Sequence, residues 1–359
     1  MDVYYFVIIF TFILCYTIKV PYDDQNTYRR KVILVFMPIM IFGALRVDFG
    51  VDYSQYETWY YEWHDTGHEI DSDLHAEIIY QWLNIVMPTW RSLLILVSGS
   101  IVGAFMMMYS KYVEPNMLML AVVFTMLYPD QSFFLQFVSM RCGLAIAGTW
   151  LCLPFIIERR YYIVLPIAFV LMNIHTSAIF FLPAALLAGR NVPLTKKEMY
   201  VWFGVFAFLA VASTTTLVRY IEPLLIGDQF ESYKIHYLEG DEHSSILNCT
   251  ANAILVYFIV SWAYRNGDSL TKAQNTICRL SLLYLMCPFL GSLGRTRMLY
   301  YYIPFYIISL TYLMKDDWPV KWHKTAFISI AVAVMLYATF FVWLRNPHFV
   351  FANYHSIFE

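Results

Sequence analysis

The stretch LSLLYLMCPFLGSLGRTRMLYYYIPFYIISLTYLM, from Leu280 to Met314, decides the fold of this protein. It is almost entirely apolar, too long for one membrane crossing and of about the right length for two. Arg295 and Arg297 fall where the turn between the two crossings is expected. A guanidinium group cannot be neutralised by losing its proton. Arginines within such an apolar stretch therefore cost free energy unless an anion binds them. The stretch therefore predicts two membrane helices joined by an anion-binding turn.

The composition of the whole chain extends this prediction. Hydrophobic residues make up 60% of the chain and charged residues 14%, whereas soluble domains carry about 25% charged residues. We therefore expect an all-α fold, a polytopic membrane helical bundle of about twelve spans. The expected spans are residues 3–19, 32–45, 91–110, 113–128, 139–157, 161–174, 177–189, 198–216, 250–265, 277–293, 298–314 and 325–344. The first lacks a basic leader and a cleavage site, so we expect it to be retained.

The basic residues predict how the bundle is oriented. Connections between successive spans alternate between the two sides of the membrane, and one side holds 16 of the 24 Lys and Arg residues. That excess places this side in the cytoplasm and both termini outside. The external basic residues are Arg46, Arg91, Arg141, Arg219, Lys234, Arg295, Arg297 and Arg345. Because arginine suits forked recognition of phosphate or carboxylate, this group predicts an external site for an anionic substrate.

Other classes of site find little support in the sequence. The six cysteines lie in or beside apolar segments and form no CxxC pair, so we expect neither disulfides nor a metal site. The net charge of −2 and the lack of a basic tract argue against a nucleic-acid partner. We expect residues 1–359 to form a single integral membrane domain with two external loops, 46–90 and 213–249. The second loop is either a substrate-binding lid or a solvated connector.

The first external loop concentrates polar and aromatic residues at its start. Arg46, Asp48, Asp52, Tyr53 and Tyr56 lie within eleven residues. If the segment from Asp52 is helical, Asp52 and Tyr56 share one face, which would suit a sugar ring that stacks on an aromatic side chain and binds a carboxylate. An interfacial aromatic belt and an internal ion pair are the alternatives.

A polar stripe follows later in the same loop. Glu77, Gln81 and Asn84 are spaced for one face of an otherwise apolar helix. This pattern predicts a helix that lies in the membrane interface or dips into the bilayer, with a simple amphipathic surface helix as the alternative.

Two ionisable residues fall within the predicted membrane region. Arg141 begins the fifth expected span, and His175 lies at the apex of the hairpin formed by the sixth and seventh. Such residues are candidates for function, although a histidine can also be hydrogen-bonded inside a bundle for structural reasons. Their predicted place on the same side as the external arginines favours a shared site for a polyanionic substrate.

The sequence resembles the EpsG family of Wzy-type polysaccharide polymerases. Five ordered pieces carry the resemblance: RVDFGVDYSQY (46–56), EIIYQWLN (77–84), MRCGLA (140–145), HTSA (175–178) and RTRMLYYYIP (295–304). Together they extend over most of the chain. Cys142 departs from the pattern, in which a polar residue such as Gln is expected.

The resemblance implies a GT-C-like architecture and an enzyme, a membrane glycosyltransferase of O-antigen, capsule or exopolysaccharide synthesis. It would polymerise undecaprenyl-pyrophosphate-linked oligosaccharide repeat units at the outer face of the bacterial plasma membrane. Lipid-linked donor and acceptor, membrane lipid and a chain-length regulator protein are the expected partners. No metal or other cofactor is expected, because arginines can stabilise an ionised leaving group.

The resemblance and the residue patterns together give the candidate site. The expected catalytic residues are His175, Asp48 and Asp52, and which of them is the base stays open. The expected substrate-binding residues are Arg46, Arg141, Arg295, Arg297, Tyr53, Tyr56, Glu77, Tyr80 and Tyr300.

Three other functions are alternatives to this one. A lipid-linked glycan ligase would have its large external loop late in the chain, whereas the largest loop here is early. A transporter or flippase of lipid-linked glycans would distribute cationic residues across the membrane, whereas these arginines gather on one side. A membrane O-acyltransferase would need an acid–His pair on the cytoplasmic side, and the sequence shows none there.

Overall fold

The computed structural model describes residues 2–19, 24–49, 52–65, 78–127, 139–188, 192–213, 246–290, 298–315, 318, 321–339 and 355–356. These residues form helices and one pair of two-residue strands, which confirms the expected all-α class. The chain divides into two compact units, the first made of Met1–Ile156, Arg160–Leu182 and Leu336–Glu359, and the second of Ile157–Arg159 and Pro183–Met335. The expected single membrane domain stays a prediction.

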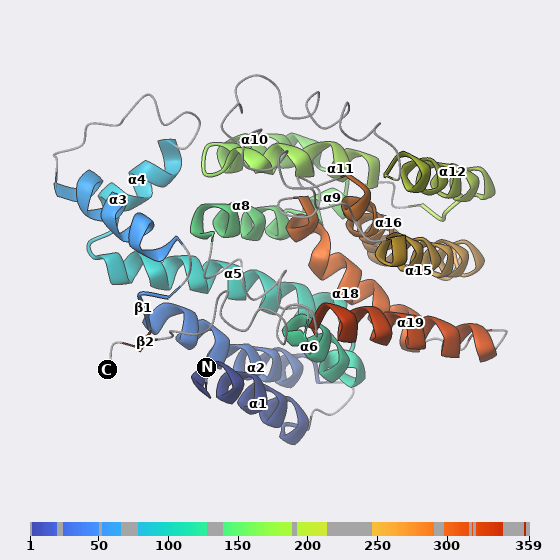
Figure 1. The fold of residues 1–359 in the computed structure, drawn as a ribbon, viewed down its shortest axis with the longest axis horizontal. Helices are drawn as coiled ribbons and strands as arrows, with labels where there is room; N and C mark the ends of the chain where they lie inside the picture. Colours follow the sequence, from blue (N-terminus) through green and yellow to red (C-terminus); the bar gives the residue numbers. More distant parts are fainter. Residues whose placement is uncertain are drawn as a thin grey trace. The chain divides into compact units, whose positions relative to one another are not determined.

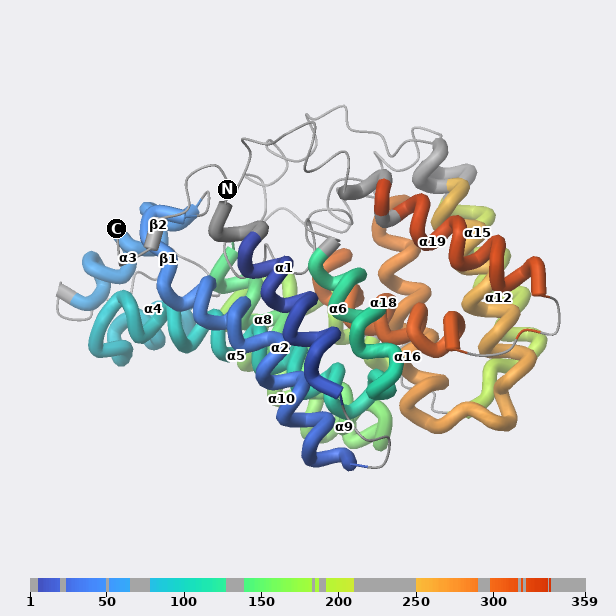
Figure 2. Tube along the Cα trace, turned by 90° about the horizontal axis from the view of Figure 1, so that it is seen from below, coloured from blue at the N-terminus to red at the C-terminus, as the bar shows by residue number. Residues whose placement is uncertain are grey.

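Unit 1 is built on helices that pack side by side in the order α1, α2, α5, α8 and α10 (Figure 1). Its elements are α1 (Asp2–Thr17), α2 (Gln25–Leu45), β1 (Arg46–Val47), α3 (Tyr53–Asp65), α4 (Ile78–Val86), α5 (Trp90–Tyr112), η1 (Pro115–Met117), α6 (Leu118–Leu127), α8 (Met140–Leu151), α9 (Leu153–Ile157), α10 (Tyr161–Met172), η2 (Thr176–Phe180) and β2 (His355–Ser356). Figure 2 shows β1 between the end of α2 and α3, and β1 pairs antiparallel with β2.

Unit 2 packs α12 on α15, α15 on α16 and α16 on α18. Its elements are α11 (Phe181–Ala188), α12 (Lys196–Ser213), α15 (Ile246–Arg265), α16 (Lys272–Met286), η4 (Cys287–Leu290), α18 (Leu299–Lys315) and α19 (Lys321–Thr339). The first residues of α11 and the last of α19 fall within unit 1.

Each of the twelve expected spans overlaps a helix, with some differences in detail. The segment 139–157 is broken at Cys152 into α8 and α9. Pro154 explains the break, because it lacks the N–H that a continuing helix would use. The segment 177–189 begins with the 3-10 turn η2 before α11. That all twelve segments cross a membrane stays a prediction.

The lengths of the helices and their exposed apolar side chains bear on whether the protein lies in a membrane. Among the described residues, α5 is long and apolar enough to span a bilayer by itself, and three shorter apolar helices are Phe6–Thr17, Pro115–Met126 and Tyr161–Met172. The outer face of α1 exposes 63% of Phe6, 52% of Ile13 and 79% of Tyr16. A run of exposed large apolar side chains on one helix face favours contact with lipid over contact with water.

Contacts at the two ends of α5 fix its direction relative to α2. The hydroxyl of Tyr28, near the start of α2, donates to the carbonyl of Val113 at 2.7 Å. At the other end, Arg91 reaches the last turn of α2. A capping box between Thr89 and Ser92 starts α5 just before that arginine. The antiparallel arrangement brings the end of α2 and the start of α5 together, on the side where the sequence predicted the external site.

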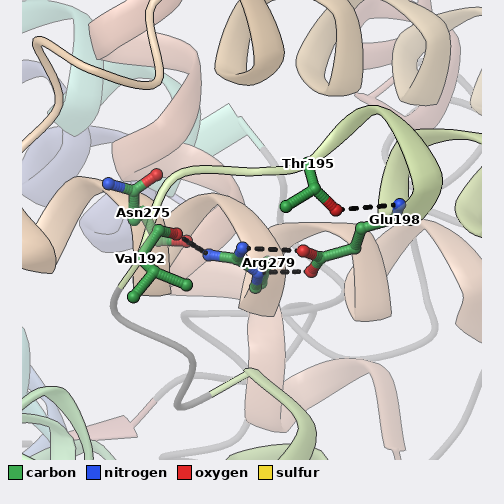
Figure 3. A network of polar contacts seen from close by, with 5 residues as sticks. All are labelled: Val192, Thr195, Glu198, Asn275 and Arg279. Atoms are coloured by element: carbon green, nitrogen blue, oxygen red, sulfur yellow. Dashed lines mark hydrogen bonds and ion pairs between the residues drawn. The ribbon is translucent and has the colours of Figure 1, made fainter.

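Close packing joins α8 to α10, and a buried ion pair joins α12 to α16. Gly148 on α8 packs closely against α10: a Cβ added there would lie 2.2 Å from a methyl of Leu171, whose side chain would have to move. In unit 2, Arg279 on α16 pairs with Glu198 on α12 (Figure 3). The pair holds the start of α12 beside α16.

Candidate active site

Two arginines meet where α2 ends. Arg46 follows the helix in an extended conformation and pairs with Ser356 in the antiparallel contact of β1 with β2. Its side chain is fully buried, and Nη1 donates to the carbonyl of Gly43 at 3.2 Å. Nη1 of Arg91 donates to the carbonyls of Ala44 at 3.0 Å and Arg46 at 2.7 Å. Backbone carbonyls therefore hold both guanidinium groups at one place.

Two carboxylates lie next to this pair. Asp48 is exposed and adopts a left-handed backbone, with φ 46°, a conformation that aspartate tolerates better than most residues. Burial raises the pKa of Glu57, the negative charge of Asp48 raises it further, and Arg91 lowers it. Asp48 and Arg91 are thus close enough to Glu57 to act on its pKa. A carboxyl with a raised pKa is a stronger base than an ordinary glutamate.

Three aromatic rings surround Arg141 at the start of α8. Its guanidinium carbon lies 5.6 Å from the ring centre of Tyr56, 4.7 Å from that of Trp59 and 6.0 Å from that of Tyr80. Burial raises the pKa of Tyr56, and the charge and hydrogen bond of Arg141 oppose that effect. Cation–π contacts hold a guanidinium without neutralising its charge. The cage therefore fixes the Arg141 guanidinium, which keeps its positive charge.

The helix α4 supplies part of this cage with its polar side turned inward. Tyr80, Gln81 and Asn84 are fully buried, whereas Trp82 is 53% exposed and Val86 63% exposed. A water-facing surface helix would show the opposite pattern, so the burial favours the predicted helix at the membrane interface. The charge of Arg46 also acts on Tyr80. Tyr80 therefore lies between the Arg46 pair and the Arg141 cage.

The His175 loop packs against the same helices. The carbonyl of Asn173 accepts a hydrogen bond from the backbone N–H of Ile79 on α4, at 3.1 Å. Sγ of Cys142, the residue after Arg141, lies 3.7 Å from Oγ of Ser177. His175 is 4% exposed and caps η2, since its Nδ1 accepts from the N–H of Ser177 at 3.2 Å.

The structure brings several of the predicted site residues into unit 1 and leaves others unplaced. Tyr53 is buried, and its hydroxyl accepts from Nε1 of Trp90 at 2.8 Å. Asp52 directly precedes α3; its carbonyl accepts from the N–H of Tyr56, and its charge raises the pKa of Tyr56. Tyr300 belongs to α18 of unit 2. The predictions for Glu77, Arg295 and Arg297, and for the loop 214–245, fall outside the described residues.

Comparison with known proteins bears on what this arrangement does. Residues 29–356 match the EpsG family. The match therefore includes every residue of what we call the arginine and aromatic cluster, which consists of Arg46, Tyr56, Trp59, Tyr80, Arg91 and Arg141. The chain belongs to the EpsG family. This confirms the resemblance found in the sequence and supports a polymerase-like role in polysaccharide biosynthesis. Neither the curated proteins nor the solved structures contain a match to this EpsG-family chain.

Sequence reasoning missed three participants in the cluster of this EpsG-family protein. Trp59 is the ring nearest Arg141, and Glu57 lies beside Asp48. Residues 355–356 pair with β1 at Arg46. Helical spacing offers a signal for Trp59 and Glu57, because residues 56, 57, 59 and 60 lie within about one turn of α3. Nothing local in the sequence predicts the strand pairing.

Proposed function

We propose that this EpsG-family chain is a membrane glycosyltransferase that polymerises undecaprenyl-pyrophosphate-linked oligosaccharide repeat units at the outer face of the bacterial plasma membrane. The observation that carries the proposal is the Arg141 guanidinium, held by three aromatic rings within the same unit as Arg46 and Arg91. A pyrophosphate carries several negative charges, and positioned cationic groups are the main requirement for its departure.

The reaction follows from that requirement. The acceptor sugar hydroxyl attacks the anomeric carbon of the donor glycan, and the new glycosidic C–O bond forms as the C–O bond to pyrophosphate breaks. The electron pair of the broken bond goes to the pyrophosphate oxygen, where the arginines stabilise it. The hydroxyl proton passes to a base on the protein. Aromatic rings beside the arginines give the sugar a surface on which to stack.

Four groups are candidates for the base. His175, Asp48 and Asp52 were predicted from the sequence, and the structure adds Glu57, whose pKa is raised by burial and by Asp48. Arg295 and Arg297 complete the proposal as ligands of the donor pyrophosphate. In this scheme the arginines supply the positive charge that a divalent metal provides elsewhere, so we propose a metal-independent reaction.

The test follows the lipid-linked glycans in cells that lack the protein and in a reconstituted reaction. We expect the deletion strain to accumulate single repeat units on lipid at the outer face, and purified protein in liposomes to extend them without added metal and in the presence of EDTA. Accumulation of lipid-linked units that face the cytoplasm would identify a flippase instead. Normal polymer that fails to reach its final acceptor would identify a ligase.

A further inference from the structure

One face of α3 packs on the first residues of α5. Tyr53 and Tyr60 both contact the ring of Trp90, with ring centres 5.4 and 5.9 Å away, and Nε1 of Trp90 donates to the hydroxyl of Tyr53 at 2.8 Å. Glu57 lies between these tyrosines, about one turn from each, so the three residues form what we call the Trp90 face of α3. This face places Glu57 beside the start of α5, where Arg91 follows Trp90.

Arg91 uses only part of its guanidinium group for internal contacts. Its Nη1 donates to the carbonyls of Ala44 at 3.0 Å and Arg46 at 2.7 Å. Its Nε and Nη2, which form the other edge of the group, make no hydrogen bond to a residue in the described part of the chain. The side chain is partly exposed. Arg91 therefore offers N–H donors from a restrained position.

Glu57 and Arg91 lie near each other without forming an ion pair. The carboxylate of Glu57 is partly exposed and makes no hydrogen bond or ion pair with any residue that the structure describes. Burial raises the pKa of Glu57, the charge of Asp48 raises it further, and the charge of Arg91 lowers it. Such a pair can bind one hydroxyl group from both sides, because the hydroxyl oxygen accepts from the guanidinium and its hydrogen is donated to the carboxylate.

This pair is distinct from the Arg141 cage. Tyr56 and Trp59 carry the cage contacts on α3, and a rotation of about 100° per residue puts Glu57 on the opposite flank of the Trp90 face. The buried Arg46 acts on the pKa of one tyrosine of the Trp90 face and of one tyrosine of the cage. The two groups of residues are therefore neighbours within unit 1.

We propose that Glu57 and Arg91 form the subsite for the acceptor hydroxyl, in which Nε and Nη2 of Arg91 hold the oxygen and Glu57 removes the proton. The inference rests on the proposed function, and it separates the acceptor groups from the donor anion at Arg141. The acceptor O–H bond breaks and its proton passes to the Glu57 carboxylate. The oxygen forms the new bond to the anomeric carbon, and the electron pair of the broken C–O bond leaves with pyrophosphate.

The test separates polymerisation from binding of the donor anion. Glu57→Gln and Arg91→Lys are compared with Glu62→Gln, a control at an exposed glutamate of α3. Polymerisation of lipid-linked repeat units is measured in liposomes, per amount of folded protein. Binding of undecaprenyl pyrophosphate, which carries the anion without a sugar, is measured by the rise that it causes in the thermal unfolding temperature. Arg141→Ala is the reference for lost anion binding.

We expect Glu57→Gln to polymerise about 10²- to 10⁴-fold more slowly than the wild-type protein, as for the loss of a general base. Arg91→Lys should be about ten- to a hundredfold slower, because one ammonium cannot hold both the backbone carbonyls and the acceptor oxygen. Both variants should bind undecaprenyl pyrophosphate as the wild-type protein does, whereas Arg141→Ala should not. Glu62→Gln should match the wild-type protein in both assays.

Arg91→Gln adds a readout that a merely structural role would not change. The charged residues of other described elements around α3 are Asp48, Arg91, Arg46 of β1 and Arg141 of α8, and α4 carries none. Of these, Asp48 and Arg91 act on the pKa of Glu57. Removing the positive charge of Arg91 raises that pKa, so the acid limb of the pH–rate profile should move to higher pH. Arg91→Lys keeps the charge and should leave the limb in place.

Three results would overturn the inference. They are wild-type polymerisation by Glu57→Gln or Arg91→Lys, a loss of undecaprenyl pyrophosphate binding as large as the loss of polymerisation, and an unchanged acid limb in Arg91→Gln. Failure of the wild-type protein to polymerise would instead reject the proposed function.

Discussion

The guanidinium carbon of Arg141 lies 4.7 Å from the centre of the Trp59 ring, although the two residues belong to helices far apart in the sequence. Tyr56 and Tyr80 complete the cage at longer distances. The arrangement holds a permanent positive charge against rings that cannot neutralise it. Arg141 is therefore oriented before a substrate arrives, which lowers the cost of binding an anion.

The cage predicts how polymerisation depends on Trp59. We expect Trp59→Leu to slow polymerisation about 2- to 30-fold, the range of one cation–π contact, and Trp59→Phe to lose less. Arg141→Lys should be nearly inactive, because an ammonium lacks the planar fork. Trp82→Leu is the matched control, since Trp82 lies on the exposed face of α4. Equal losses in Trp59→Leu and Trp82→Leu would count against the cage.

The expected turn between the spans 277–293 and 298–314 gives a second prediction, which rests on the sequence. We expect Arg295→Ala with Arg297→Ala to abolish polymerisation while the protein stays in the membrane, and lysine at either position to rescue it poorly. Lys272→Ala, at an exposed position in the first turn of α16, should have no effect. Full activity of the double alanine variant would remove pyrophosphate binding from these positions.

The neighbouring carboxylates predict a shift in pH dependence. A base must be deprotonated to act, so activity should fall as the pH drops through the pKa of Glu57, which burial and Asp48 hold above the usual value for glutamate. Asp48→Asn removes a negative charge and lowers that pKa, so the acid limb of the pH–rate profile should move to lower pH. Glu57→Gln should be inactive across the range.

The same variants separate the two carboxylates. If Asp48→Asn is inactive at every pH while Glu57→Gln polymerises normally, Asp48 is the base. An unchanged acid limb in Asp48→Asn, together with an active Glu57→Gln, would exclude both residues from the role. Asp52→Asn tests the remaining carboxylate predicted from the sequence in the same assay.

The ion pair of unit 2 predicts a stability effect that is not additive. Nε and Nη2 of Arg279 donate to the two carboxylate oxygens of Glu198 at 2.7 and 3.0 Å, and Nη1 donates to the carbonyls of Val192 and Asn275. Arg279 is 1% exposed. Glu198→Gln leaves a buried positive charge without its carboxylate, which costs on the order of 3–5 kcal/mol.

A double substitution checks this prediction. Arg279→Met in the Glu198→Gln background removes the uncompensated charge, so we expect thermal unfolding in detergent to recover part of the lost stability. Two independent, additive losses would show that the pair contributes no coupling. The polymerisation rate per folded protein should stay at the wild-type level in these variants, because neither residue belongs to the proposed site.

Periodicity and composition predicted much of this fold, because long apolar segments must become helices in a membrane protein. The same reasoning placed Arg46, Arg141 and His175 on one side. It did not identify Glu57 or Trp59 as site residues: helical spacing puts them in the same turn as Tyr56, but their roles depend on how α3 packs against α4 and α8. Arg279 is one of the 16 basic residues whose excess predicted the cytoplasmic side, and that count could not show that it is buried against Glu198.

The helix-capping contact of His175 marks another limit of sequence reasoning. A histidine at the apex of a hairpin is a reasonable base until the backbone N–H that points to Nδ1 is known. That contact depends on an extended residue at 175 followed by a 3-10 turn, a geometry that the letters HTSA do not specify. The chemistry of the residue was therefore predictable, but its direction of hydrogen bonding was not.

The orientation of the chain gives the last prediction. Ser54 is exposed on α3, which the distribution of basic residues places outside, and Ser269 is exposed in the turn between α15 and α16, which it places in the cytoplasm. We expect an impermeant thiol reagent to label Ser54→Cys and Ser244→Cys in intact cells, and Ser269→Cys only after permeabilisation. The native cysteines described in the structure, Cys15, Cys142, Cys152, Cys278 and Cys287, are buried and should give little background. Labelling of Ser54→Cys only after permeabilisation would place the arginine and aromatic cluster on the cytoplasmic side, where a polymerase that acts on exported repeat units could not use it.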